Sequence, residues 1–566
     1  MYKVSIISKG LYKAMLGAGS IVERKFIKNT RDAKKVNEEV LLKILKKNYN
    51  TEIGRDYNFK NIKSIDDYKR SIPLNNYSFY EKYIDKMMRG NNNILFKEKL
   101  EYFGHTSGTT GKQKLIPTNK TNRLVGSKYM ALMINRYSYK EFKDRWNYGR
   151  GLLIADIVNT TYSEGGTPIC SATSGGIQAI KNILKYLYTS PIEVMMVEDK
   201  ETALYLHLLF ALYDSSLLYI SGVFISNVLD LFRVFQKNSK ALIRDLRRGT
   251  ISRTLNISDK IRNKLNKMIK PNSTRANLIE EEIKKGYKGI ARRIWPSLTY
   301  IATVTGANFT IYDEKVNYYT DNLPIYSPVY AATEATIGIN PYVKKVEYVI
   351  IPDTCFYEFI PVGDNDNRTY LINELKLNKA YEIVVTNYAG LYRYKLGDVV
   401  KVKGYYNDCP SIEFLYRKNQ ILNMVSEKTN EEHLTNAIKN TMKKMKLTVA
   451  DYTTLPDNDV TPGRYVFYFE INEKVNSIKM LEKELDAELR LCNLAYDRAR
   501  KGKKLSNVKI VLVKNNTFNK IKDELLSNGV SKNQIKIPRV IVNNKKILGT
   551  LMKNIIWFYI KRNYLL

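Results

Sequence analysis

The alternation of hydrophobic and polar residues predicts a chain in which helices and short buried strands follow one another. Apolar residues recur at helical spacing in residues 33–47, and residues 64–69 have the pattern of a capped helix start. Residues 180–295 are expected to be mainly helical, with helical stretches at 217–237 and 273–287. Short apolar runs predict strands at 151–158, 299–304, 347–351, 382–386 and 399–402, with turns at 165–168 and 174–176. This mixture predicts an α/β architecture.

A second, smaller unit is expected near the C-terminal end of the chain. Its pattern predicts a strand at 465–471, a helix at 477–493, a strand at 508–514 and a helix at 518–528, with a loop rich in Pro, Asp and Gly at 456–463. We therefore predict a large α/β domain over residues 1–425 and a small α+β domain over residues 426–566.

The composition is that of a globular protein with a large core. The chain has 566 residues, of which 44% are hydrophobic. Its four cysteines are scattered without a CxxC pair, which fits a reducing compartment, and we expect no metal site from them and the three histidines. Residues 1–27 lack the pattern of a secretory signal, so we predict a cytoplasmic protein. The basic and apolar run at 547–566 is expected to form a helix packed on its own domain, with an interfacial helix at a membrane as the alternative.

The formal net charge of +36 raises the alternative of a non-enzymatic protein that binds nucleic acid or an anionic membrane. The lysines are spread over the whole chain rather than gathered into a tail or stripe. We therefore favour solvated charge, and a field that steers acidic ligands is the preferred functional variant.

Residues 106–119, TSGTTGKQKLIPTN, carry the strongest chemical signal. Glycines allow backbone N–H groups to turn inward around an anion, and the Ser and Thr hydroxyls add donors. Lys112 or Lys114 adds positive charge. The segment lacks the spacing of a P-loop, but its chemistry predicts a loop that holds a polyphosphate.

A second motif is PVYAATEATIGIN at residues 328–340, in which Glu334 follows Thr333 in an apolar setting of small residues. A carboxylate in such a setting needs a partner or a cation. If Mg²⁺ accompanies a nucleotide, Glu334 is a natural ligand. The alternative, which the motif alone would favour, is an acid at a helix N-terminus that faces solvent.

Two further motifs carry charged residues whose roles remain open at this level. Asp398 follows a glycine in residues 388–401, and it is either a turn residue or a carboxylate that accepts both hydroxyls of a ribose. Arg417 follows in the next predicted strand, where a surface arginine is the alternative. Lys536, between two isoleucines, either extends a charge into a cleft or is an ordinary lysine of an edge strand.

Taken together and in this order, these motifs resemble the signatures of the adenylate-forming superfamily, which includes the acyl-CoA synthetases. The chain is most similar to the Gretchen Hagen family of auxin-responsive acyl-acid amido synthetases. The likeness rests on the block YAGLYRYKLGD at 388–398 and covers residues 35–541 approximately. Further segments that resemble the family are IWP at 294–296, VTG at 304–306, YEFIP at 357–361, RKN at 417–419 and QIKIPR at 534–539.

The resemblance implies a role for each matched residue. Glu334, with Thr333, resembles the segment near the α-phosphate and Mg²⁺, which makes Glu334 the metal ligand. Asp398 resembles the ribose-binding acid and Arg417 its partner. Lys536 resembles the mobile lysine of the C-terminal domain, and Lys428, beside the presumed hinge, is a weaker candidate for a catalytic role. The expected phosphate-loop residues are Thr106, Ser107, Gly108, Thr109, Thr110 and Lys114.

The family implies an ATP- and Mg²⁺-dependent ligase in which a small mobile C-terminal lid closes over a large acyl-CoA-synthetase-like domain. Such an enzyme activates a carboxylic acid as an acyl-adenylate and passes the acyl group to an amine, usually an amino acid. Transfer to coenzyme A or to a carrier thiol is the alternative outcome. Stretches expected to shape the acid pocket are 159–166, 171–177, 304–309 and 336–339. The residues in these stretches do not identify which acid is bound.

Overall fold

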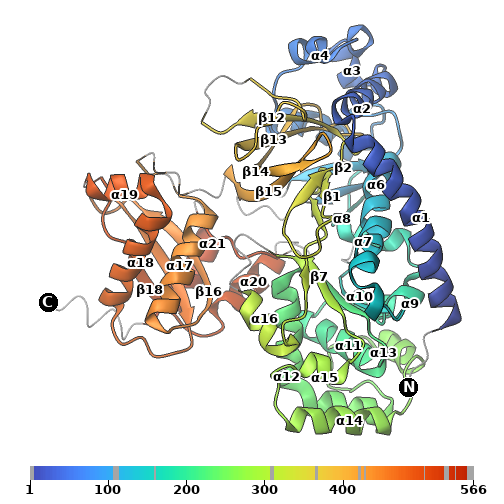
Figure 1. The fold of residues 1–566 in the computed structure, drawn as a ribbon, viewed down its shortest axis with the longest axis vertical. Helices are drawn as coiled ribbons and strands as arrows, with labels where there is room; N and C mark the ends of the chain where they lie inside the picture. The colour runs from blue at the N-terminus through green and yellow to red at the C-terminus, as the bar shows by residue number, and fades with distance from the viewer. Residues whose placement is uncertain are drawn as a thin grey trace. The chain divides into compact units, whose positions relative to one another are not determined.

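A computed structural model describes residues 5–105, 114–157, 161–305, 312–363, 368–418, 422, 424–425, 427, 429–502, 504–527, 535–541 and 544–556. The chain divides into two compact units (Figure 1). The first comprises the described residues up to Leu396 together with Val400–Glu413. The second comprises Gly397–Val399 and the described residues from Phe414 onward.

The largest sheet has seven strands in the order β12-β13-β14-β15-β11-β10-β9. Hydrophobic side chains fill both of its faces; in β12, four successive residues are buried. Such continuous burial is typical of a strand covered on two sides. The strands are β9 (Val329–Ala331), β10 (Thr336–Ile339), β11 (Tyr348–Ile350), β12 (Phe356–Pro361), β13 (Ala380–Thr386), β14 (Tyr394–Tyr406) and β15 (Cys409–Arg417).

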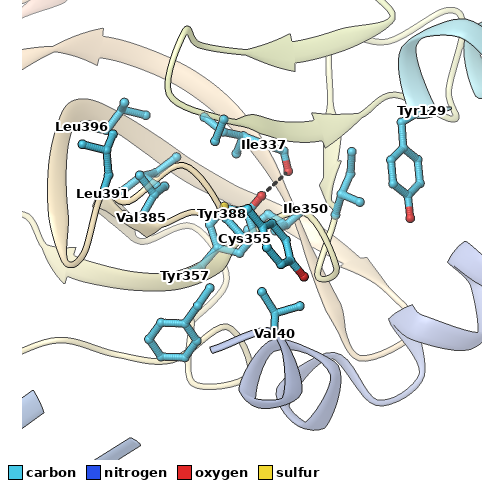
Figure 2. Close-up of a cluster of buried hydrophobic side chains, with 14 of the residues drawn as sticks. Val40, Tyr129, Ile337, Ile350, Cys355, Tyr357, Val385, Tyr388, Leu391 and Leu396 are labelled. Atoms are coloured by element: carbon cyan, nitrogen blue, oxygen red, sulfur yellow. Dashed lines mark hydrogen bonds between the residues drawn. The ribbon is translucent and has the colours of Figure 1, made fainter. Parts of the chain in front are cut away.

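Helix α2 (Ala33–Asn48) packs against this sheet and is tied to it by a buried amide. Asn37 donates to the carbonyls of Pro352 and Cys355 and accepts from the backbone N–H of Tyr357. Figure 2 shows the core nearby, where the Tyr357 hydroxyl donates to the carbonyl of Ile337 at 3.2 Å. The helix predicted at 33–47 is confirmed.

A second sheet of the first unit is parallel and has the order β3-β6-β7-β8. The helices around this sheet pack on its strands, and together they form an apolar cluster that is separate from the core around the seven-stranded sheet. The strands are β3 (Gly151–Ile154), β6 (Tyr219–Phe224), β7 (Tyr300–Val304) and β8 (Ile325–Tyr326), and the main helices are α11 (Lys200–Tyr213), α12 (Ile225–Arg248), α14 (Ser273–Lys284), α15 (Ile290–Ile294) and α16 (Asp313–Thr320).

Two predictions near this sheet are wrong. The helix predicted over 217–237 begins with strand β6, because a short apolar run does not distinguish a buried strand from a helix by its period. The turn predicted at 174–176 lies inside helix α8 (Ala172–Ala179). Gly175 is needed there because a Cβ would lie 2.8 Å from a ring carbon of Tyr102.

A third sheet of the first unit has the order β2-β1-β5-β4. Its strands are β1 (Leu100–His105), β2 (Leu115–Asn119), β4 (Thr161–Tyr162) and β5 (Pro168–Cys170). The remaining helices of this unit are α3 (Glu52–Asp56), η1 (Phe59–Asn61), α4 (Ile65–Ser71), α5 (Tyr77–Met88), α6 (Lys120–Lys128), η2 (Tyr129–Met133), α7 (Ile134–Glu141), η3 (Lys143–Arg145), α9 (Leu184–Leu187), α10 (Ile192–Met195) and α13 (Asp259–Asn266). The capped start predicted at 64–69 is confirmed, since Ser64 and Asp67 form a capping box on α4.

Helix α1 (Ile6–Thr30) was not expected from the sequence pattern. Its inward face carries aromatic anchors, with Tyr12 edge-on to Trp146 and Phe26 edge-on to Tyr129. Its outward face exposes the apolar residue Ile21, so the alternation of apolar and polar residues in the sequence does not indicate an amphipathic helix clearly. Within the described residues, no helix is both long and apolar enough to cross a bilayer.

The second unit is an α+β fold around a three-stranded sheet of order β16-β17-β18. The predicted succession of strand, helix, strand and helix is confirmed by β17, α18, β18 and α20. Strand β16 was not predicted, and its last two residues occupy the first two positions of the loop predicted at 456–463. The elements are α17 (Glu431–Met445), β16 (Val449–Asp457), β17 (Arg464–Ile471), α18 (Ile478–Cys492), α19 (Leu494–Lys501), β18 (Lys509–Val513), α20 (Thr517–Ser527) and α21 (Lys545–Lys553).

Candidate functional site

The predicted polyphosphate loop connects two paired strands of the first unit. Strand β1 ends at His105, which lies opposite Leu115 of β2 in the antiparallel register. The predicted loop residues Thr106, Ser107, Gly108, Thr109 and Thr110 fall outside the described residues, so their role stays a prediction. The remaining loop residue, Lys114, is half-buried, with its ammonium 5.6 Å from the ring centroid of Tyr77.

The second motif lies directly beside the strand that enters this loop. A Cβ on Gly104 would lie 2.8 Å from the side-chain methyl of Thr333. A side chain at position 104 would therefore collide with Thr333, and only glycine permits the close approach. The contact brings the motif at 328–340 against the entrance of the motif at 106–119.

Glu334 sits in the connection between β9 and β10 rather than at a helix N-terminus, so that alternative is wrong. The two strands are antiparallel, with Thr336 opposite Ala331, and Glu334 is only 6% exposed. A buried carboxylate at the tip of a strand pair fits a cation ligand better than a solvated surface acid.

Two buried asparagines join the three main motifs. Asn387, which directly precedes the YAGLYRYKLGD block, donates through Nδ2 to the carbonyl of Glu334 at 2.8 Å. Asn119, the last residue of β2, donates through Nδ2 to the carbonyl of Tyr388 at 2.6 Å. The loop motif, the glutamate motif and the first residues of the third motif are therefore held together by side-chain amides.

Asn387 also shapes the turn that begins the third motif. Its Oδ1 accepts from the backbone N–H groups of Ala389 and Leu391 at 2.9 and 3.0 Å. Gly390 has φ of +86°, and a Cβ there would lie 2.5 Å from the Cβ of Leu95. The glycine of the motif is therefore required by backbone geometry and packing.

Much of the YAGLYRYKLGD block belongs to the core rather than to a binding surface. Arg393 is 6% exposed and makes a bidentate pair with Glu358, at 3.0 Å from Nε and 2.8 Å from Nη2. Its Nη1 donates to the carbonyls of Lys69 and Ile72. Figure 2 shows Tyr388, Leu391 and Leu396 among the buried side chains.

Asp398 and Arg417 form an ion pair within the second unit. Arg417 Nε donates to Asp398 Oδ1 at 2.6 Å. The Asp398 side chain is 4% exposed and the Arg417 side chain 43% exposed. Asp398 lies within strand β14, so the alternative of a turn residue is wrong, whereas the Arg417 side chain still lies partly at the surface.

Lys536 lies in the segment 535–541 of the second unit, between two buried isoleucines, Ile535 and Ile537. Its ammonium is 3.3 Å from Oε2 of Glu431, the first residue of α17. The side chain is 21% exposed, which leaves it partly accessible to solvent. Lys428, the weaker catalytic candidate, falls outside the described residues.

Polar residues gather where the strands of the parallel sheet end. Thr305, after β7, donates through Oγ1 to Asp313 at 2.7 Å. Ser327, after β8, shares a hydrogen bond with the hydroxyl of Tyr348 at 2.7 Å. Ligands of open α/β sheets bind outside the carboxyl ends of the strands. Thr305 belongs to the stretch at 304–309 that is expected to shape an acid pocket, of which residues 306–309 fall outside the described residues.

The pattern did not identify Asn119, Asn387 or Gly104 as parts of the site. A buried asparagine that holds a backbone carbonyl has no spacing signature, because its partner is distant in sequence. Burial raises the pKa of the Cys170 thiol to about 11, which keeps the thiol protonated at neutral pH.

Three family models match the chain in succession. The GH3 family N-terminal domain matches residues 22–325, the GH3 family central domain residues 348–417, and the GH3 family C-terminal domain residues 432–545.

Several known proteins are similar over nearly the whole chain. A jasmonoyl-L-amino acid synthetase of Nicotiana attenuata is 29% identical, covering 94% of this chain and 95% of the relative. A 4-substituted benzoates-glutamate ligase of Arabidopsis thaliana is 30% identical, covering 92% and 94%. The solved structure of the GH3.15 acyl acid amido synthetase superposes with a TM-score of 0.85 at 25% identity, covering 95% of this chain and 96% of that chain.

Proposed function

The chain belongs to the GH3 family of adenylate-forming acyl-acid amido synthetases, and from this premise we propose how its residues carry out the reaction. The enzyme joins a carboxylic acid to an amino acid at the expense of ATP. A carboxylate is a poor electrophile, because its charge repels nucleophiles and oxide is a poor leaving group. Activation of the acid must therefore come first.

In the first step, a carboxylate oxygen bonds to the α-phosphorus of ATP while the bond to pyrophosphate breaks. In the second step, a neutral amine attacks the acyl carbon, the bond to AMP breaks and the amine loses a proton. Neither step needs a protein nucleophile. The protein has to align the reactants and offset the charge that develops on the phosphates.

We assign the nucleotide to residues of the motifs described above. Asp398 accepts the ribose hydroxyls, Arg417 orients its carboxylate, and Lys536 offsets charge on the phosphates. The loop residues Thr106, Ser107, Gly108, Thr109 and Thr110 supply donors, with Lys114 adding charge at the end of the loop. The pairing of Asp398 with Arg417 at 2.6 Å supports the assignment, because it fixes one carboxylate oxygen.

Glu334, supported by Thr333, is the residue that we assign to Mg²⁺. Its burial, together with the position of the preceding Thr333 beside Gly104, fits a cation shared with phosphates. When bound, Mg²⁺ withdraws charge from the phosphate oxygens. Glu334 itself provides a fixed negative charge at a turn whose backbone Asn387 holds.

The domain assignment is part of the same proposal. Residues 1–425 bind ATP and the acid, and residues 426–566 form a mobile lid that keeps water from the mixed anhydride. Lys428 stays the weaker candidate for a catalytic role, and it falls outside the described residues. We place the enzyme in the cytoplasm, consistent with its free cysteines.

The substrate class follows from the relatives only in outline. Their names specify jasmonate in one case and 4-substituted benzoates in another, so the acid differs within the family. We infer an apolar or aromatic acid and an amino acid for this chain. Transfer to a thiol is the second candidate, and product mass distinguishes an amide from a thioester.

The linkage of the three motifs through Asn119, Asn387 and Thr333 carries the proposal. We would test it with an acid mixture of jasmonic, 4-aminobenzoic and octanoic acids, offered with ATP, Mg²⁺ and the proteinogenic amino acids. The expected result is AMP and pyrophosphate release that requires the acids, with amide products by mass spectrometry. Thioester products with coenzyme A and no amides would favour the second candidate.

A further inference from the structure

Lys536 is paired with a carboxylate that has no place in the family motifs. Its Nζ lies 3.3 Å from Glu431 Oε2, and the Glu431 side chain is 1% exposed. Glu431 is the first residue of α17, next to the cap Asn430, where the helix dipole favours negative charge. A carboxylate buried this deeply needs a cationic partner.

The backbone that follows Lys536 is hydrogen-bonded to strand β16. The carbonyl of Pro538 accepts from Thr453 Oγ1 at 2.6 Å, and the carbonyl of Arg539 accepts from the Thr454 backbone N–H at 2.9 Å. Ile535 and Ile537, the residues on either side of Lys536, are both buried. Lys536 therefore belongs to a segment whose neighbouring residues are held in place.

Helix α17 is fixed to the same strand. The guanidinium of Arg539 lies 4.5 Å from the ring centroid of Tyr452 on β16 and also donates to Asp451. The Tyr452 hydroxyl is hydrogen-bonded at 2.9 Å to Thr435 of α17. Tyr452 therefore links the segment that carries Lys536 to the helix that carries Glu431.

We propose that Glu431 is a positioning residue for adenylation, which holds the ammonium of Lys536 at a fixed point on the second unit. The inference rests on the proposed role of Lys536. A free lysine side chain loses substantial rotamer freedom when it engages a phosphate. A buried carboxylate that already restrains the ammonium removes part of that cost. Since both residues belong to one unit, the pair stays together in any movement of that unit.

The test is acid-dependent ATP–pyrophosphate exchange by the full-length enzyme, with the mixture of jasmonic, 4-aminobenzoic and octanoic acids. Lys536→Gln is expected to lower the exchange rate about 100-fold, as for other residues that offset transition-state charge. Glu431→Gln is expected to lower its maximal rate about tenfold, with KM for ATP changed by less than about twofold. Because Glu431 acts through Lys536, the double variant should match Lys536→Gln alone.

Several results would overturn the inference. Normal exchange by Glu431→Gln, with exchange lost in Lys536→Gln, removes Glu431 from the mechanism and leaves the role of Lys536 intact. Normal exchange by Lys536→Gln instead refutes the proposed role of Lys536 and the inference with it. A double variant slower than Lys536→Gln indicates a structural role for Glu431.

Two further variants guard against a folding effect. Glu482→Gln is a matched control, because Glu482 pairs with Lys509 at 3.4 Å in the same unit, and it should exchange normally. If Glu431→Gln fails to fold, Glu431→Asp keeps the charge at a shorter reach and should show an intermediate exchange rate. Wild-type exchange by a folded Glu431→Asp, whose carboxylate is drawn back from Lys536, would contradict the inference.

Discussion

Arg417 donates through Nε to Oδ1 of Asp398 at 2.6 Å, and the two side chains differ tenfold in exposure, at 43% and 4%. The arginine contacts one carboxylate oxygen and is itself half in solvent. A charge-assisted hydrogen bond of this kind orients a carboxylate, and we propose that it orients Asp398 for the ribose hydroxyls of ATP.

Asp398→Asn should therefore lower kcat/KM for ATP about 100-fold, because two charge-assisted hydrogen bonds at about 1.5 kcal/mol each are lost. The measurement is acid-dependent AMP formation over a range of ATP concentrations. Asp457→Asn is the matched control, since Asp457 pairs with Arg464 at 2.9 Å in the same unit. Equal ATP dependence in the two variants would contradict the ribose assignment.

Glu334→Gln should raise the Mg²⁺ concentration needed for half-maximal activity at least about tenfold, the scale seen when groups around a metal are removed. The amide keeps the size of the buried side chain, so the fold should be retained. Magnesium titration of pyrophosphate release measures the effect. Glu98→Gln, at a carboxylate bonded to Lys47 and Thr121, should leave the titration unchanged.

Asn387→Ala should lower the free energy of unfolding by about 2–4 kcal/mol, because a buried amide with three hydrogen bonds is removed. It should also raise the Mg²⁺ requirement, since Glu334 loses the contact that holds its carbonyl. Urea unfolding and magnesium titration of the same preparation measure both. A destabilised variant with the normal Mg²⁺ requirement would show that Asn387 supports the turn alone.

Arg393→Lys should destabilise the fold by about 1.5–3 kcal/mol, the scale of hydrogen bonds to charged groups, while the folded fraction keeps its KM for ATP. Lysine cannot reproduce the bidentate pair with Glu358 together with two carbonyl contacts. Urea unfolding and ATP titration measure the two effects separately. A raised KM for ATP with unchanged stability would instead place Arg393 at the nucleotide.

The sequence predicted the helices and strands in which hydrophobic residues recur at a regular period. The prediction failed where tertiary contacts determine the secondary structure. The helix at 33–47 and the alternation in the second unit were predictable from local pattern. Strand β6 was not, because its burial between β3 and β7 overrides the helical period that continues into α12. Helix α1 was missed because apolar residues such as Ile21 also lie on its outward face.

The residues of the candidate site also fall into two groups: those that the local sequence indicates, and those whose role depends on a partner far away in the chain. Glu334 was singled out because a carboxylate among small apolar residues needs a partner or a cation, and Asp398 because the block at 388–398 resembles the family. The roles of both stay predictions. Asn387 and Asn119 were not predicted, because each acts on a carbonyl far away in the chain, with separations of 53 and 269 residues. The role of Arg393 in the core likewise depends on Glu358, which no local pattern connects to it.

His207 should make the first unit less stable at mildly acidic pH. It is 1% exposed on α11, with Nδ1 hydrogen-bonded to Ser190 Oγ at 2.7 Å, and burial lowers its pKa from 6.5 to about 4. Above pH 6.5 the imidazole is neutral in both the folded and the unfolded chain. As the pH falls from 6.5 to about 4, the unfolded chain binds a proton that the folded chain does not, so stability is lost.

The shift corresponds to a limit of about 3 kcal/mol, at 1.36 kcal/mol for each pKa unit. His207→Asn keeps a polar atom near Ser190 but does not titrate, so it should flatten the fall in unfolding free energy between pH 6.5 and 4.5. Urea unfolding at several pH values measures this slope. His433, half-buried on α17 of the other unit, provides a comparison, because burial also lowers its pKa. If the unfolding free energy falls equally between pH 6.5 and 4.5 in His207→Asn and in the parent, proton uptake elsewhere controls the acid sensitivity of the protein.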